Sequence, residues 1–226
     1  MTAQLEAYVA DEANQVEELT LPFEVPAPAK PATAPPDVEP GKFGTIIADP
    51  PWAYQQTSRH AKLSGYSDQE YEPLSTDELC ALPVADLAAD TSVLLLWATF
   101  PMFGDALRVV DAWGFDYVTA LAWVKADPVS GNVGYGVGDW FRGAVEPVLV
   151  GKRRRSYRSP WVGLIHPGLN HSRKPSHLHE IAETTYPGPR LELFARQRRD
   201  GWTTLGNECP GDGRDIRDSL TDLVKQ

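Results

Sequence analysis

The sequence predicts an α/β domain with a doubly wound, mostly parallel sheet, preceded by an acidic tail. Two observations lead to this fold class. Several short apolar runs bounded by turn residues are typical of buried strands, and amphipathic helical patterns lie between some of them. Strands that alternate with helices favour a parallel sheet covered by helices on both faces. The length of 226 residues fits one such domain plus a tail.

Residues 1–40 are expected to form the tail, which is disordered, acidic and rich in proline. Prolines punctuate this stretch, and its few large apolar side chains cannot bury enough surface to fold. Within it, Leu5–Leu19 has the composition of a transient acidic helix. The folded domain is therefore assigned to residues 41–226.

Five strands are expected in this domain. Each is a short apolar run that ends at polar or turn residues, which is typical of a buried strand. In chain order they are Phe43–Ala48, Ser92–Ala98, Tyr117–Val124, Ala144–Val150 and Leu191–Ala195.

Four helices are expected around these strands. The pattern from Ser75 to Glu78 is that of a capping box, which opens a helix toward Leu82. Met102–Trp113 has apolar residues at helical spacing and is followed by Gly114, a typical helix end. The remaining two are His177–Thr184 and Arg214–Lys225.

The charges are segregated along the chain, whose net charge is −10. The tail has eight carboxylates and one lysine, whereas residues 152–199 have eleven Lys and Arg against three Glu. An acidic protein with such a basic segment is compatible with a polyanionic partner. Lys152–Arg155 and Arg158 are either a solvated charged loop or, beside a base-binding site, contacts to phosphate groups.

Several classes of protein are disfavoured. Cys80 and Cys209 are too few for a disulfide framework and lack metal-ligand spacing, and the spacing of His171, His177 and His179 resembles no usual zinc site. No metal is therefore expected. No apolar run reaches the roughly 18 residues of a membrane span, and the N-terminus has no signal-peptide pattern. A cytoplasmic protein without a membrane contact is expected.

The most informative motif is Asp49-Pro50-Pro51-Trp52, which follows the first expected strand. An aromatic amine is a poor nucleophile because its lone pair is delocalised into the ring, so an enzyme must orient it and accept its N–H groups. Asp49 and the Pro50 carbonyl can do this, since proline rings fix the backbone and remove N–H donors. Trp52 would then stack a flipped base. A strand end closed by a Pro-Pro turn, with Trp52 in the core, explains these four residues equally well.

The position of the motif agrees with ligand binding. In open α/β sheets, ligands bind beyond the carboxyl ends of the strands. Asp49 follows one strand, and Arg196 leaves the Leu191–Ala195 strand in the same way. These two strand ends, far apart in the sequence, are expected to border one pocket.

Five blocks, in this order, resemble the family of the eukaryotic mRNA adenosine N6-methyltransferase catalytic subunit, from about Phe43 to Glu208. They are Asp49–Trp52, Gly138–Arg142 with Glu146, His171–Pro175, Leu191–Arg196, and Gly201-Trp202 with Gly206–Glu208. The resemblance implies a Rossmann-like methyltransferase domain over residues 41–226 that uses S-adenosylmethionine. It also implies a permuted motif order, in which the catalytic tetrapeptide precedes the main cofactor-binding strand.

The resemblance also implies roles for individual residues. Asp49, Pro50, Pro51 and Trp52 would form the catalytic tetrapeptide. The residues expected near the cofactor are Asp49, Lys174, Phe194, Arg196, Asn207 and Glu208. The residues expected to face the substrate are Tyr54, Tyr71, Arg142, Glu146, His171, Ser172, Arg173 and Lys174. Taken alone, Phe194 would be a core aromatic, and Asn207 and Glu208 a helix cap or turn. The run Gln197-Arg198-Arg199 is more basic than the corresponding family segment, so no ribose contact is assigned to it.

The resemblance therefore predicts an S-adenosylmethionine-dependent adenine N6-methyltransferase that acts on nucleic acid. DNA is the favoured polymer because the short chain, with no appended RNA-binding module such as a zinc finger, resembles the compact bacterial and phage members of the family. Two alternatives are an RNA adenosine N6-methyltransferase and a non-catalytic, nucleic-acid-binding subunit of a methyltransferase complex. Action as a homodimer or with a partner subunit is compatible with the sequence.

Overall fold

The computed structural model describes residues 38–54, 72–125, 133, 141, 143–154, 164–165, 174–209 and 214–225. The tail assigned to residues 1–40 lies almost entirely outside this range, as does the helix expected at Leu5–Leu19. The division into a tail and a domain therefore stays a prediction.

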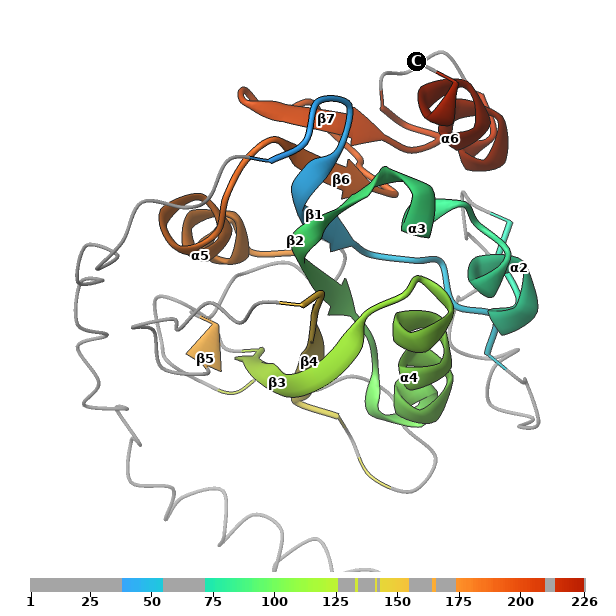
Figure 1. The fold of residues 1–226 in the computed structure, drawn as a ribbon. Helices are drawn as coiled ribbons and strands as arrows, with labels where there is room; N and C mark the ends of the chain where they lie inside the picture. The colour runs from blue at the N-terminus through green and yellow to red at the C-terminus, as the bar shows by residue number, and fades with distance from the viewer. Residues whose placement is uncertain are drawn as a thin grey trace, which may run out of the picture.

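The described residues form a seven-stranded sheet with the order β5-β3-β4-β2-β1-β6-β7 (Figure 1). All neighbouring strands pair in parallel except β4, which is antiparallel to both β2 and β3. The mostly parallel sheet predicted from the sequence is thus confirmed. The strands are β1 (Phe43–Ala48), β2 (Ala88–Trp97), β3 (Asp116–Val124), β4 (Val145–Lys152), β5 (Leu164–Ile165), β6 (Arg190–Leu193) and β7 (Trp202–Leu205).

Helices cover both faces of this sheet (Figure 1). Successive strand residues point to opposite faces, and accordingly Ile46 and Leu94 belong to one apolar cluster while Ile47 and Leu95 belong to another. The first cluster includes side chains of four helices, and the second includes side chains of α5. The doubly wound arrangement is thus confirmed. The helices are α2 (Thr76–Cys80), α3 (Val84–Leu87), α4 (Phe103–Ala112), α5 (His177–Thr185) and α6 (Ile216–Val224), with a 3-10 turn, η1, at Phe100–Met102.

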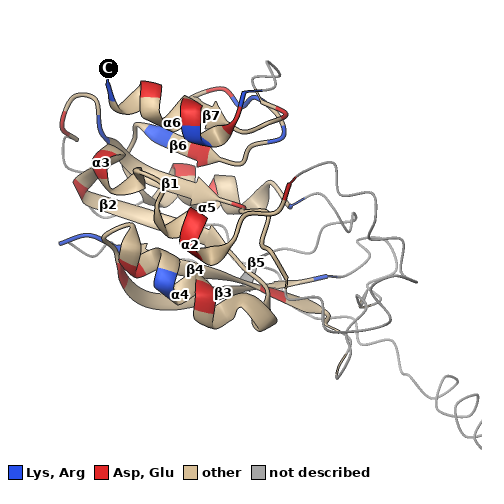
Figure 2. Ribbon diagram, turned by 90° about the vertical axis from the view of Figure 1, so that its right-hand side faces the viewer, with Lys and Arg blue, Asp and Glu red and all other residues tan. Residues whose placement is uncertain are grey.

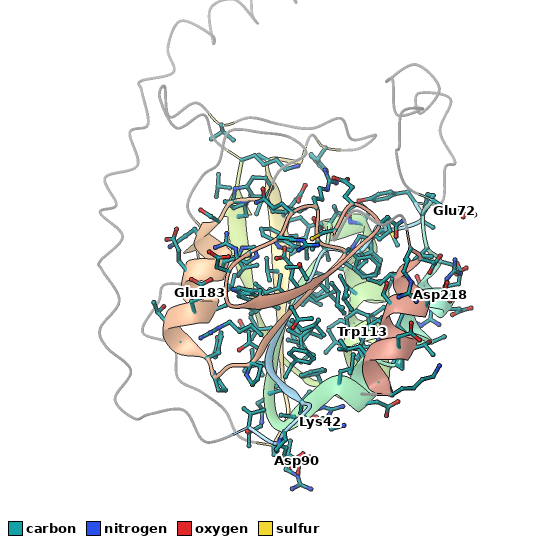
Figure 3. The ribbon with its side chains drawn as sticks, turned by 90° about the horizontal axis from the view of Figure 1, so that it is seen from above. Lys42, Glu72, Asp90, Trp113, Glu183 and Asp218 are labelled. Atoms are coloured by element: carbon teal, nitrogen blue, oxygen red, sulfur yellow. The ribbon has the colours of Figure 1, made fainter. Side chains whose placement is uncertain are left out.

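The interior on the four-helix side is centred on a fully buried tryptophan. Trp113, directly after α4, has 0% exposure, and its indole N–H donates to the Leu79 carbonyl of α2 at 2.8 Å. Figure 3 shows it deep among the other side chains. Buried indoles normally find a hydrogen-bond partner, so this contact ties α4 to α2 through the core.

All five predicted strands and all four predicted helices are present; β1 has the predicted ends, and the ends of the others are shifted. The largest shift is in β2, which begins at Ala88 rather than at Ser92. The sequence patterns missed α3, η1, β5 and β7. The first three are too short to show a period, and β7 has two threonines in its four residues.

The capping box at the start of α2 is confirmed. The Ser75 hydroxyl accepts from the Glu78 backbone N–H at 3.3 Å, and Glu78 Oε2 accepts from the Ser75 backbone N–H at 2.9 Å. The preceding residue, Leu74, forms a parallel bridge with Trp52. The cap therefore fixes the segment that holds the tetrapeptide loop.

Replacing Ser75 with alanine should lower the free energy of unfolding by about 1 kcal/mol, because the first turn of α2 loses an acceptor for its free N–H groups. Chemical denaturation of the purified protein measures this. Ser219→Ala is the matched control: it removes a hydroxyl inside α6, where alanine is the better helix former. Equal stability of the Ser75→Ala protein and the wild type would contradict the prediction.

Candidate active site

Functional side chains from distant parts of the chain meet at the carboxyl edge of the sheet. Asp49 follows β1, Trp97 is the last residue of β2, and Lys125 follows β3. Because β4 is antiparallel, it begins at this same edge, which brings Glu146 opposite Trp123 in the strand register. Lys174 precedes α5 and completes the group. In Figure 3, Lys42 and Asp90 mark the other edge, near the starts of β1 and β2, and Glu72 lies far from them.

Two carboxylates and two lysines form a network of alternating sign. Lys174 Nζ lies 2.7 Å from Glu146 Oε2 and 3.4 Å from Asp49 Oδ1. Lys125 Nζ lies 2.5 Å from the other Glu146 oxygen, Oε1. The side chains of Lys125 and Glu146 are 16% and 12% exposed, and those of Lys174 and Asp49 are 26% and 30% exposed. Asp49 is thus the most accessible member, while Glu146 is enclosed between two cations.

Burial and this network shift the pKa values in ways that matter for chemistry. Burial raises the pKa of the Asp49 carboxyl above its ordinary 3.8, and the cations of Lys174 and Arg196 only partly oppose this. Burial would also raise the pKa of Glu146, but Lys174 and Lys125 outweigh it and lower that pKa. Burial would lower the pKa of Lys174, but Asp49 and Glu146 outweigh it and raise that pKa. Glu146 and Lys174 therefore stay charged at neutral pH.

Two buried indoles form the wall behind the lysines. The rings of Trp97 and Trp123 meet edge to face, with centroids 5.7 Å apart. Lys174 Nζ lies 4.7 Å from the Trp97 ring centre and 5.8 Å from that of Trp123. Such cation–π contacts contribute roughly 0.5–2 kcal/mol each. They hold the ammonium group of Lys174 beside Asp49.

The sequence patterns missed Lys125, Trp97 and Trp123 as functional residues. Each lies at the carboxyl end of an expected strand, which is the signal that could have found them. The strand order that brings β3 beside β4 and β4 beside β2 could not be derived from the apolar runs.

The tetrapeptide loop is held by its own backbone and by Leu74. The Trp52 N–H donates to the Pro50 carbonyl at 2.9 Å, and the Leu74 N–H donates to the Pro51 carbonyl at 2.9 Å. The Pro50 carbonyl therefore has a local donor, contrary to the expectation of few competitors. Its second lone pair remains the acceptor for a ligand N–H.

The stacking role predicted for Trp52 is wrong in this structure. The side chain is 6% exposed and lies in the apolar core, and its indole N–H donates to the Trp97 carbonyl at 3.1 Å. A ring with so little exposed surface offers no face to a base. The alternative, a strand end closed by prolines with the tryptophan in the core, describes Trp52 correctly. Tyr54 is the better candidate for stacking, since it is 41% exposed and its hydroxyl lies 3.0 Å from Thr99 Oγ1.

The loops after β6 and β7 touch beside Asp49. The Asp49 N–H donates to the Leu193 carbonyl at 3.4 Å, and the Ala195 N–H donates to the Leu205 carbonyl at 3.0 Å. Phe194, between them, is partly buried and has φ 61°, a left-handed conformation that side chains rarely adopt. This strained backbone marks a candidate ligand contact.

Gly206 allows this close approach. A Cβ atom at this position would lie 2.3 Å from the Ala195 carbonyl oxygen and 2.7 Å from its nitrogen. Gly206 and Cys209 then exchange backbone hydrogen bonds of 2.7 and 3.1 Å, which closes a turn with Asn207 and Glu208 exposed at its tip. The turn anticipated as the alternative for Asn207 and Glu208 is observed, and it presents an amide and a carboxylate to solvent beside the β6 loop.

This edge suits S-adenosylmethionine chemically. With the cofactor bound, Asn207 and Glu208 would offer donors and acceptors to ribose hydroxyls, the ring of Phe194 would contact the adenine, and the ammonium of Lys174 would pair with the carboxylate. Arg196 is exposed, and its charge acts on Asp49. The two strand ends after β1 and β6 lie side by side, because these strands pair in parallel. That they border one ligand pocket stays a prediction.

Several predicted site residues cannot be assigned a position. Tyr71, Arg142, His171, Ser172 and Arg173 lie outside the described residues. Their roles stay predictions.

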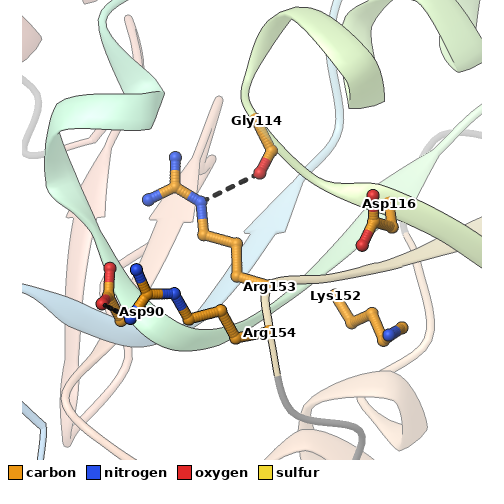
Figure 4. Close-up of a pocket in the computed structure, with 6 residues that line it drawn as sticks. All are labelled: Asp90, Gly114, Asp116, Lys152, Arg153 and Arg154. Carbon is orange, nitrogen blue, oxygen red and sulfur yellow. Dashed lines mark hydrogen bonds and ion pairs between the residues drawn. The ribbon is translucent and has the colours of Figure 1, made fainter.

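The first part of the basic segment, Lys152–Arg154, does not lie beside the site. Since β4 runs away from the carboxyl edge, Lys152–Arg154 lie at the opposite edge, around a pocket of about 220 Å³ that Asp90 and Asp116 also line (Figure 4). Arg153 donates to the backbone carbonyls of Ala88 and Gly114 at 2.8 and 3.1 Å. The expectation that these three residues contact phosphate next to a base is therefore wrong. Arg155 and Arg158 lie outside the described residues.

Three further findings concern the described residues alone. They contain no group of three His, Cys, Asp or Glu side chains arranged to hold a metal ion. None of the helices described is both long enough and apolar enough to cross a bilayer. Acidic and basic residues are mixed on α4, α6 and β6 (Figure 2).

Comparisons with known proteins agree with this site. The family model described as MT-A70 matches residues 43–208. The chain is 31% identical over 182 residues to a putative N(6)-adenosine-methyltransferase MT-A70-like protein of Medicago truncatula, covering 76% of this chain and 27% of that protein. It is 29% identical over 191 residues to the type II methyltransferase M.MunI of Mycoplasma sp, covering 75% and 78%. It is 28% identical over 179 residues to the human N(6)-adenosine-methyltransferase catalytic subunit METTL3, covering 76% and 29%. The chain thus spans only about a quarter of the plant and human proteins' length.

Proposed function

Since this chain belongs to the MT-A70 family, we propose that it transfers a methyl group from S-adenosylmethionine to the N6 amine of adenine in nucleic acid. The observation that carries the proposal is the accessible carboxylate of Asp49, held at 3.4 Å by Lys174 beside the touching loops after β6 and β7. An acceptor for an amine and a site for an adenosine group thus lie together.

The proposed chemistry needs the amine to be oriented. When bound, the cofactor supplies an electrophilic methyl group on a positively charged sulfur. Asp49 Oδ2 and the free lone pair of the Pro50 carbonyl accept the two N6 hydrogens, which turns the nitrogen lone pair toward that methyl group. Lys174 binds Asp49 Oδ1 and so fixes the carboxylate plane.

The methyl group passes directly from sulfur to nitrogen, without a covalent intermediate on the protein. A bond forms between N6 and the methyl carbon as the sulfur–carbon bond breaks, and the sulfur keeps the electron pair. The amine is left with a surplus proton. Asp49 Oδ2 accepts it and passes it to solvent, a role that its raised pKa suits.

DNA is proposed as the polymer. One relative, of whose length the match covers 78%, is named a type II methyltransferase. The names of the plant and human relatives, N(6)-adenosine-methyltransferases, favour RNA adenosine as the second candidate. A non-catalytic subunit is the third, and it predicts that the cofactor does not bind.

One experiment separates these candidates. The full chain is incubated with isotope-labelled S-adenosylmethionine and matched single-stranded DNA, duplex DNA or RNA, and the nucleosides are analysed by mass spectrometry. Labelled N6-methyladenine in a DNA pool supports the proposal, and label confined to RNA supports the second candidate. Cofactor binding without any label points to a missing partner subunit. Absence of cofactor binding by calorimetry supports the non-catalytic reading.

The pH dependence of methyl transfer should report Asp49. Only the carboxylate accepts the amine hydrogens, so kcat/KM should fall as the pH drops through the pKa of Asp49. Because burial raises this pKa, the fall should come at a higher pH than for an ordinary aspartate. Steady-state rates between about pH 3 and 9, with circular dichroism at each pH as a control for folding, measure it. An acid limb in the range of an exposed aspartate, with the protein folded, would exclude Asp49 as the acceptor.

A further inference from the structure

One carboxylate in the site is shared by two lysines, only one of which contacts Asp49. Glu146 gives Oε2 to Lys174 and Oε1 to Lys125. Lys125 therefore reaches Asp49 through two intermediate side chains, Glu146 and Lys174. A methyl-transfer site needs no second lysine for the contacts proposed above, so the role of Lys125 requires a separate explanation.

The backbone holds Lys125 firmly in this position. Its N–H donates to the Ala144 carbonyl at 2.8 Å, directly beyond the paired ends of β3 and β4. Its Nζ lies 5.7 Å from the Trp123 ring centre. The side chain is 16% exposed. Such a nearly buried ammonium is retained only with a close partner, because burial of an unpaired charge is costly. Glu146 is that partner.

The charges explain what Lys125 does. With Lys125 present, Glu146 is balanced on both oxygens, and Lys174 is shared between Glu146 and Asp49. Without Lys125, the network would hold one more negative than positive charge, and Glu146 would draw Lys174 away from Asp49, from which Nζ is already 3.4 Å distant. The charged groups that act on Asp49 are Lys174, Glu146 and Arg196. Of these, only the ion pair between Lys174 and Glu146 depends on Lys125, which contacts Glu146.

We propose that Lys125 is a positioning residue: it occupies and neutralises Glu146, so that Lys174 stays available to hold Asp49 in its ionised, reactive orientation. Its consequence for catalysis rests on the proposed methyl transfer. The charge coupling itself is a property of the protein alone and can be measured without substrate.

The coupling is tested by titrating Asp49 directly. Carboxyl carbons of aspartate are labelled with carbon-13 in the full chain, the Asp49 signal is assigned by its loss in Asp49→Asn, and its titration is followed by NMR. In Lys125→Met the Asp49 midpoint should move to higher pH, because one positive charge has left the network. Lys125→Arg should return it toward the wild-type midpoint. Lys152→Met, which removes a lysine from the far end of β4, should leave it unchanged.

Activity gives the second readout. With the preferred polymer, kcat of Lys125→Met should fall roughly tenfold to a hundredfold at neutral pH through misplacement of Lys174 and Asp49, with a smaller change in KM. Its acid limb should move to higher pH, and Lys125→Arg should recover most of the rate. Lys125→Gln serves as a second uncharged variant if the methionine protein does not fold.

The possible outcomes distinguish a failure of the positioning role of Lys125 from a failure of the proposed methyl-transfer function. An Asp49 midpoint that is the same in the wild type and both uncharged variants overturns the positioning role, whatever the activity. A shifted midpoint in a protein that methylates no polymer, even with a partner supplied, supports the coupling and contradicts the methyl-transfer function. An equal loss of rate in the arginine and methionine variants, without a pH shift, shows a merely structural lysine and also overturns the proposal.

Discussion

Replacing Asp49 with asparagine is expected to lower the rate of methyl transfer by about a hundredfold to several thousandfold, or on the order of 3–5 kcal/mol in activation free energy. Asparagine keeps the shape but loses the negative charge, and its NH₂ group can turn toward the amine as a donor. The variant would lose both the charge that favours the developing cation on N6 and one acceptor for its hydrogens. The loss should appear mainly in kcat, since these interactions strengthen in the transition state.

Single-turnover transfer of labelled methyl groups measures this loss free of product release. Cofactor binding to Asp49→Asn, measured by calorimetry, shows whether the site survives. Asp111→Asn is the matched control, because Asp111 is an exposed aspartate on α4 and its replacement should leave the rate unchanged. Near-wild-type turnover of folded Asp49→Asn would contradict the proposed mechanism.

Replacing Gly206 with alanine is expected to destabilise the protein by on the order of 3 kcal/mol, the upper range for overpacking. The added Cβ would lie 2.3 Å from the Ala195 carbonyl oxygen, so the backbone of one loop has to move. The Tm should fall by roughly 6–12 °C for a domain of this size. Since Phe194 and Asn207 flank this contact, cofactor affinity should fall as well.

Gly104→Ala provides an internal control of the same chemistry. Gly104 is the second residue of α4, and nothing lies within 4 Å of a Cβ atom built there. There the change should stabilise by about 0.5–1 kcal/mol, since alanine favours the helix. Opposite signs for the two substitutions, in thermal unfolding followed by circular dichroism, are the expected result. A Gly206→Ala protein as stable as the wild type would show that the two loops separate at little cost.

The sequence predicts best what depends on neighbouring residues. The capping box at Ser75 and the strand Phe43–Ala48 needed only local patterns, and both agree with the structure. The prediction of Asp49, Glu146 and Lys174 rests on motifs at three separate positions that resemble one family, and the structure brings these side chains together. The approach of these three side chains could not be derived from any one segment.

The wrong predictions and the overlooked residue have one cause: each depends on contacts between distant parts of the chain. Whether Trp52 faces a ligand or the core depends on its bridge with Leu74, 22 positions further along the chain. The location of Lys152–Arg154 depends on the direction of β4, which an apolar run does not reveal. Lys125 acquires a role only because β3 pairs with that same strand.

Because β4 is antiparallel to its neighbours, catalysis depends on the correct pairing of this strand. Glu146 lies beside the two lysines because it pairs with Trp123 in the strand register. A slip of one residue would turn every side chain of β4 to the other face of the sheet, so Glu146 would leave both cations while an apolar strand remained in place. Such a molecule would be compact but inactive. Mispairing of this one strand would therefore lower the catalytically competent fraction of a preparation without unfolding it.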